Sequence, residues 1–120
     1  MLQIRRLAAD ELDHLTEIDV AEKVTLSYRW RDGRLESIQC DSERPFWNAS
    51  DWAHHVAEWQ QHLQPDLWLG AFDGERLVGA ASLRYRLREK MAQLTTLHID
   101  RNSRRQGVAR QLMTEVKRMA

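Results

Sequence analysis

The sequence is poor in the residues that cross-link or interrupt a chain. It has one cysteine, Cys40, two prolines and five glycines in 120 residues. A single cysteine excludes an internal disulfide and suits a reducing compartment. Neither sign of charge is in excess, because eighteen basic residues balance eighteen acidic ones. The overall charge therefore gives no reason to expect nucleic acid or a membrane as a partner.

Long apolar runs and two familiar phosphate-binding motifs are also missing. The start, MLQIRRLAADEL, has no signal-peptide core, and no stretch is apolar for long enough to span a bilayer. Neither G-x-x-x-x-G-K-[ST] nor G-x-G-x-x-G occurs, which excludes a Walker loop and the dinucleotide fingerprint. With 42% apolar residues and five tryptophans, the chain reads as one cytosolic globular domain with a substantial core.

Hydrophobic periodicity predicts the elements, and two Asp-Gly pairs, at 32–33 and 73–74, predict hairpin turns. The order predicts an α/β or α+β fold in which helices cover a largely antiparallel sheet. The predicted elements are a strand over 2–7, a helix over 9–19, a hairpin with strands 24–30 and 35–39, a helix over 51–63 capped by Asn48 or Ser50, strands carrying LWLGAF, LVGAASLRY and AQLTTLHI, and a helix over 107–120.

The stretch RRQGVARQLM, residues 104–113, places a glycine between a basic loop and an amphipathic run. The first N–H groups of a helix lack partners within it, and the helix dipole makes that end partly positive. Gly107 has no Cβ, so a ligand can approach the backbone closely. With Arg104, Arg105 and Arg110 as cationic donors, these features predict a pyrophosphate site. The alternative is a glycine that eases a tight turn among solvated arginines.

The longer segment LTTLHIDRNSRRQGVARQLM resembles the acetyl-CoA-binding segment of GNAT-type N-acetyltransferases. Their signature, [QR]-x-x-G-x-[GA] between a strand and a helix, is matched by residues 104–109. The order of elements follows the family as well, so the resemblance covers residues 1–120 as a single, incomplete N-acetyltransferase domain. The first hairpin and LTTLHI resemble the streptothricin-acetyltransferase-like branch.

The resemblance implies a GNAT-like fold, a mixed and mostly antiparallel sheet flanked by helices, with acetyl-CoA as the co-substrate. The backbone of the strand end LHI would pair with the pantetheine arm as an added strand. The amides of residues 105–110 would hold the pyrophosphate. The residues expected to bind acetyl-CoA are Leu97, His98, Ile99, Arg104, Arg105, Gln106, Gly107, Val108, Ala109 and Arg110.

The reaction that the resemblance implies is direct attack of a small-molecule primary amine on the thioester. Backbone donors near the strand would stabilise the developing oxyanion. Some members carry a glutamate or histidine as the base, but here that position is Gln93, with Thr95 two residues on. His98 is the candidate base. A core-facing histidine, and catalysis by positioning with bulk water as the proton acceptor, stay open.

The acceptor side is acidic and aromatic in sequence. Asp19, Glu22, Tyr28 and Trp30 offer carboxylates and π faces to a cationic amine, although such residues also simply solvate a surface. His54, Glu58 and His62 share one helix face, which we interpret as solvated, and we expect no metal site. Trp52, Trp59 and Trp68 are predicted to lie in the core.

The sequence reaches Ala120 inside the motif helix, whereas the family continues with a parallel strand, a helix and a hairpin. We therefore expect a fragment, or a second chain that supplies the rest, and a homodimer stays open. Such a fragment would leave Val108, Leu112 and Val116 partly uncovered. A non-catalytic acyl-CoA-binding half-domain is the alternative function. A nucleic-acid module using residues 84–105 is disfavoured by the zero net charge.

Overall fold

The computed structural model of the chain describes residues 2–88 and 91–119. Residues 1, 89, 90 and 120 lie outside this part, so two residues of the segment 84–105 considered above for nucleic-acid binding, and the last residue of the predicted helix 107–120, do too. The order of elements is the one that the periodicity predicts, with a short additional helical turn before the last helix.

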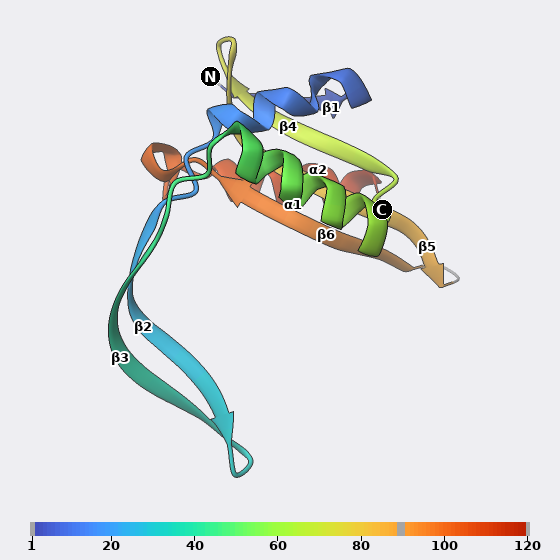
Figure 1. Cartoon of the computed structure of the whole chain (residues 1–120). Helices are drawn as coiled ribbons and strands as arrows, with labels where there is room; N and C mark the ends of the chain where they lie inside the picture. Colours follow the sequence, from blue (N-terminus) through green and yellow to red (C-terminus); the bar gives the residue numbers. More distant parts are fainter. Residues whose placement is uncertain (1, 89–90, 120) are drawn as a thin grey trace.

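One antiparallel sheet forms the centre of the molecule. Its strand order is β1-β4-β5-β6, and every neighbouring pair runs antiparallel. Figure 1 shows the strands crossing the body of the molecule, with α1 in front of them and α2 behind. The prediction of a largely antiparallel sheet is confirmed. The strands are β1 (Leu2–Leu7), β4 (Leu67–Asp73), β5 (Arg76–Arg88) and β6 (Met91–Ile99).

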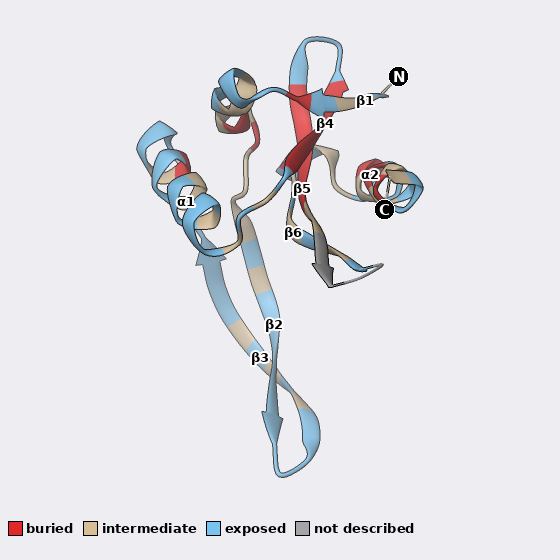
Figure 2. Ribbon diagram, turned by 90° about the vertical axis from the view of Figure 1, so that its right-hand side faces the viewer, coloured by how far each residue is buried: buried red, intermediate tan, exposed pale blue. Residues whose placement is uncertain are grey.

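Helices cover both faces of this sheet, as Figure 2 shows. α2 (Val108–Met119) packs on one face, and η1 (Ala9–Glu17) and α1 (Ala49–His62) lie on the other. The sheet therefore has a buried cluster on each side. In the part of the chain that the structure describes, no helix combines the length and the apolar character needed to cross a membrane.

The cluster under α2 corrects one expectation. Val108, Leu112 and Val116 are 2%, 0% and 6% exposed, because they pack against Leu69 of β4, Val78 of β5 and their neighbours. The expectation that these three side chains lack cover is wrong. On the other face, Trp52 and Trp68 are buried at 2% and 4% exposure, and Trp59 packs partly buried against them.

The predicted first hairpin forms, and it is longer than predicted. β2 (Glu22–Arg31) and β3 (Arg34–Arg44) pair antiparallel as a separate two-stranded sheet. Asp32 and Gly33 close it with φ of 51° and 75°, as a two-residue hairpin turn requires. Figure 1 shows this hairpin, which we call the arm, projecting away from the body.

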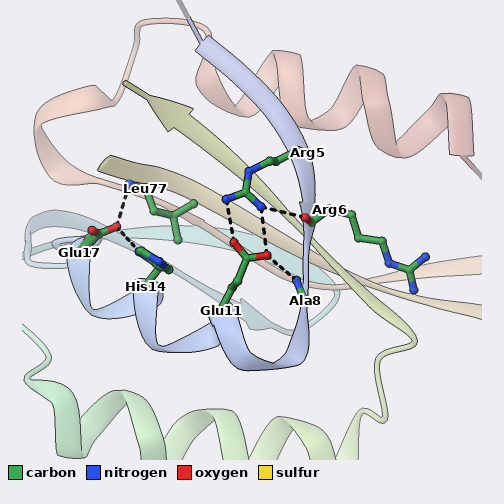
Figure 3. A network of polar contacts seen from close by, with 7 residues as sticks. All are labelled: Arg5, Arg6, Ala8, Glu11, His14, Glu17 and Leu77. Carbon is green, nitrogen blue, oxygen red and sulfur yellow. Dashed lines mark hydrogen bonds and ion pairs between the residues drawn. The ribbon is translucent and has the colours of Figure 1, made fainter. Parts of the chain in front are cut away.

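The first predicted helix is a 3-10 helix that ends at Glu17, two residues before the predicted end. Side-chain contacts hold it on the sheet (Figure 3). Glu11 accepts from the Arg5 guanidinium at 2.7 and 3.1 Å and from the Ala8 N–H at 3.1 Å. The Arg5 hydrogen bond and the Ala8 N–H lower the pKa of Glu11 to about 2. At the other end, Glu17 accepts from the Leu77 N–H at 2.9 Å.

The second helix, α1, begins with a complete set of local signals. Asn48 is the N-cap, and its side chain accepts from the Asp51 N–H at 2.9 Å while Asp51 accepts from the Asn48 N–H at 3.0 Å. This is a reciprocal capping arrangement. Trp47, just before the cap, packs edge-on against Trp52 with 5.0 Å between ring centroids. The pair of tryptophans acts as a hydrophobic staple and directs the chain from the arm onto the sheet.

Candidate functional site

The predicted anion site is formed where β6 runs into α2. After Asp100, the chain makes a short 3-10 turn, η2 (Arg101–Ser103), and then a turn in which Arg105 and Gly107 have φ of 65° and 83°. The Gly107 carbonyl accepts from the Gln111 N–H at 3.0 Å, so Gly107 is the residue that starts the helix. A Cβ built on Gly107 would meet nothing within 4 Å. Glycine is required here by backbone conformation, and the space beside it is open.

A cavity of about 470 Å³ lies at this helix start, and we call it the helix-start cavity. The first N–H groups of α2 have no acceptors within the helix, and the helix dipole adds partial positive charge there. Three arginines surround the same opening, which suits a pyrophosphate. The lining residues are Ile99, Ser103, Arg104, Arg105, Gly107, Val108, Ala109 and Arg110.

Beside it lies a second cavity of about 590 Å³, where the arm joins the body, and we call it the arm-root cavity. Ile99 and Arg104 line both cavities, so the two open on the same end of β6. Arg104 Nη1 lies 3.4 Å from the Ala21 carbonyl and 3.9 Å from a Glu22 carboxylate oxygen. The lining residues are Val20, Glu22, Arg44, Pro45, Trp47, Leu97, His98, Ile99 and Arg104.

β6 provides the wall that the two cavities share. It is the last strand in the order of the sheet and pairs with β5 on one side. Its other edge therefore carries backbone N–H and C=O groups that can accept an added extended chain. Leu97 and Ile99, at the end of this strand, line the arm-root cavity. A pantetheine arm can therefore run along this edge toward the helix-start cavity.

His98 lies in an aromatic cluster on the α1 side of β6. Its ring stacks on Trp59 with 5.0 Å between centroids and meets Trp52 edge-on at 5.4 Å. Burial, and secondarily the charge of His55, lowers the pKa of His98 from 6.5 to about 4, so the ring is neutral at pH 7. Its Nε2 atom is buried and has no hydrogen-bond partner among the described residues. His98 thus takes the core-facing position that the sequence left as an alternative. It is also one of the residues that line the arm-root cavity.

The structure separates the predicted acceptor residues. Glu22, at the start of the arm, lines the arm-root cavity. Tyr28 and Trp30 lie farther along the arm, 60% and 72% exposed, and line neither cavity. Asp19 lies next to the loop that follows β6, because its N–H donates to Asp100 at 2.8 Å. Of the four predicted residues, Glu22 is the one that the fold brings to a cavity.

The predicted acetyl-CoA residues gather more closely. Nine of the ten line one of the two cavities, and Gln106 is the exception, because its side chain donates back to the Asn102 carbonyl at 3.2 Å. Elsewhere, His54, Glu58 and His62 are all exposed on α1, as the interpretation of a solvated helix face predicts, and His54 and Glu58 lie 3.5 Å apart.

Sequence reasoning missed four residues of the arm-root cavity, Val20, Arg44, Pro45 and Trp47. The sequence does carry a signal for Trp47. A hydrophobic staple pairs the residue before the N-cap with the fourth residue of the helix, and around Asn48 these two residues are Trp47 and Trp52. The other three come from segments that meet only in the folded chain.

Comparison with known families agrees with this geometry. The sequence model of the acetyltransferase (GNAT) family matches residues 32–120, which is most of the chain. The protein therefore belongs to the GNAT acetyltransferase family. A search of curated proteins found no match in sequence.

Two solved structures share the fold. One is a putative streptothricin acetyltransferase from Bacillus anthracis str. Ames in complex with acetyl coenzyme A, with a TM-score of 0.61 and 20% identity over 98% of this chain. The other is a nourseothricin acetyltransferase, with a TM-score of 0.70 and 15% identity over 94% of this chain. This chain spans 64% and 62% of the length of those two chains.

Proposed function

We propose that this chain is the acetyl-CoA-binding part of an N-acetyltransferase that acts on a primary amine of a small molecule. The observation that carries the proposal is the helix-start cavity, where a positive-φ glycine and three arginines surround the start of α2 beside the edge of β6 that faces away from β5. These residues fit an extended chain that ends in a pyrophosphate. The family supports the same ligand, since the solved neighbour from Bacillus anthracis is in complex with acetyl coenzyme A.

The proposed roles follow from the two cavities. The edge of β6 at Leu97–Ile99 holds the pantetheine arm, and the amides of residues 107–110 with Arg105 hold the pyrophosphate. When bound, acetyl-CoA would supply the thioester that the amine attacks: a C–N bond forms, the C–S bond breaks and coenzyme A leaves as the thiolate, which takes up a proton from water, and the amine nitrogen loses a proton. The arm-root cavity takes the acceptor, with the Glu22 carboxylate toward the ammonium and the Trp47 face beside it.

His98 is a weak base in this arrangement. A conjugate acid with a pKa of about 4 lies well below pH 7, and general bases work best when their pKa is near the working pH. We therefore propose that His98 shapes the cavity wall and that the amine transfers its proton to water.

A cytosolic location remains part of the proposal, and the free Cys40 suits it.

The alternative function is acyl-CoA binding without turnover. The weak basicity of His98 favours it. Turnover separates the two functions: release of free thiol from acetyl-CoA in the presence of a small primary amine supports the transferase, and tight binding with no release supports the alternative.

The test of the acetyl-CoA site is calorimetric titration of the chain with acetyl-CoA, alongside Gly107→Glu. The new carboxylate would fill the open space beside the backbone and repel the phosphates, so we expect affinity to fall at least about a hundredfold. Gly33→Glu in the arm is the matched control, because Gly33 also has positive φ, at 75°, and open space around it. Unchanged affinity in a folded Gly107→Glu would contradict the site.

A further inference from the structure

Asp100 is a fully buried carboxylate, at 0% exposure, directly after β6. Its Oδ1 accepts from the Asp19 N–H at 2.8 Å and from Arg76 Nη2 at 3.2 Å. Its Oδ2 accepts from the Asn102 N–H at 3.1 Å, which starts the η2 turn. A buried carboxylate needs such donors, because an unpaired charge away from water is costly.

The Asp19 contact joins two segments that are 81 residues apart in sequence. One is residues 19–22, which we call the arm root, and the other is residues 100–107, which we call the motif loop. The Arg101 N–H donates to the Asp19 carbonyl at 2.8 Å, so both backbone groups of Asp19 are paired with the motif loop. Arg104 adds the contacts to Ala21 and Glu22 described above.

The two joined segments line the two neighbouring cavities. The motif loop lines the helix-start cavity and reaches the arm-root cavity through Arg104, while the arm root brings Val20 and Glu22 to the arm-root cavity. Asp100 lines neither cavity. The hydrogen bonds of Asp100 therefore set the position of the arm root relative to the motif loop, while Asp100 itself contacts no ligand in either cavity.

We propose that Asp100 is a positioning residue that fixes the acceptor side of the site to the acetyl-CoA loop, so that binding at the motif loop also orders the arm root. The inference rests on the proposed function. The hydrogen bonds between the arm root and the motif loop require the motif loop to be ordered. A ligand that orders the motif loop therefore also stabilises these hydrogen bonds, because the two equilibria are linked. A change of a single buried acceptor should then break the coupling and leave the two cavities otherwise intact.

Amide hydrogen exchange with coenzyme A as the probe tests this. In the unmodified chain we expect coenzyme A to slow exchange at least threefold in two places, residues 101–110 and the arm root. Asp100→Ala removes both side-chain oxygens, so the Asp19 N–H loses its acceptor, and we expect the slowing to persist at 101–110 and to vanish at the arm root. Asp51→Ala is the matched control, because Asp51 also accepts a backbone N–H at a helix start but lies in α1, and it should keep both responses.

A second variant covers the case in which Asp100→Ala does not fold. Arg101→Pro removes the donor of the second Asp19 contact at the first position of η2, where proline fits a helix start, and Asp100 before it already has extended backbone with ψ of 138°. We expect it to weaken the arm-root response by at least half.

Three results would decide against the proposal. Slowing confined to 101–110 in the unmodified chain, or an arm-root response that survives in both variants, would overturn the positioning role and leave the acetyl-CoA site standing. No slowing anywhere would overturn the proposed function, and the positioning role with it.

Discussion

The arm and the β4–β5 hairpin are built alike and packed differently. Each is an antiparallel pair that turns at an Asp-Gly, with positive φ at Gly33 in one and Gly74 in the other. Residues 67–72 of β4 are all buried between helices, whereas every residue of β2 and β3 is exposed or only partly buried. Figure 2 shows this contrast along the two hairpins.

The comparison shows that strand pairing alone does not bury the apolar side chains of a hairpin. Residues facing the same side in the arm, such as Leu26, Tyr28 and Trp30, are as apolar as those of β4, yet they are 43%, 60% and 72% exposed. The body has α2 on one side and η1 with α1 on the other, and these helices contribute the burial. A two-stranded hairpin without such cover gains little stability from its apolar side chains.

The largest expected effect sharpens that comparison directly. Leu112→Ala removes a side chain that is 0% exposed between α2 and the sheet, so we expect the free energy of unfolding to fall by about 3 kcal/mol. Leu35→Ala, at a site 66% exposed in the arm, should change it by less than about 0.5 kcal/mol. Urea denaturation measures both. Equal losses would mean that the arm is covered in solution, as a homodimer could do.

A pH effect should also be confined to the body. Folding lowers the pKa of His98 from 6.5 to about 4, so between these values the unfolded chain binds a proton that the folded chain does not. Stability from this residue is therefore complete above about pH 6.5 and lost as the pH falls toward 4, by at most about 3 kcal/mol.

Melting temperatures from pH 7.5 to 4 check this prediction. His98→Gln should flatten the curve relative to the unmodified chain, because its side chain does not titrate. His54→Gln, at an exposed histidine of α1, is the control and should leave the curve unchanged. Parallel curves for all three proteins would show that His98 is not buried in its neutral form.

A smaller effect is expected at the boundary between arm and body. Glu22→Gln removes the carboxylate that lines the arm-root cavity, and we expect KM for a small amine to rise about tenfold, or about 1.4 kcal/mol. Glu36→Gln, in the arm and outside both cavities, should leave KM unchanged. An acetylation assay with varied amine concentration measures both, and equal KM values for the two variants would remove Glu22 from the acceptor site.

The smallest effect is expected at the exposed part of the arm. Trp30→Ser changes a side chain that is 72% exposed, so stability should change by less than about 0.5 kcal/mol and acetyl-CoA affinity by less than about twofold. Calorimetry and the same amine assay check this. A clear rise in the amine KM would restore Trp30 to the acceptor site that the sequence predicted.

Local signals predicted the local features of this fold. The Asp-Gly turns, the Asn48 cap and the start of α2 at Gly107 each depend on a few neighbouring residues, and each formed where the sequence placed it. Most of the residues that we expect to bind acetyl-CoA gather for the same reason, since the loop and helix start that carry them are one continuous segment. Most of the arm-root cavity was harder to predict, because Val20 precedes the arm and Arg44 and Trp47 follow it, and these two segments meet only when the arm folds back on itself.

The sequence by itself determined the order of elements, the two hairpin turns and a helix start suited to an anion, because periodicity, turn chemistry and helix ends act over a few residues. The tertiary structure alone decided three things: which hairpin is covered, that His98 lies among tryptophans, and that Asp100 meets Asp19 across 81 residues. These depend on which surfaces exclude water from which side chains, and burial of that kind is a property of packed elements rather than of any short segment.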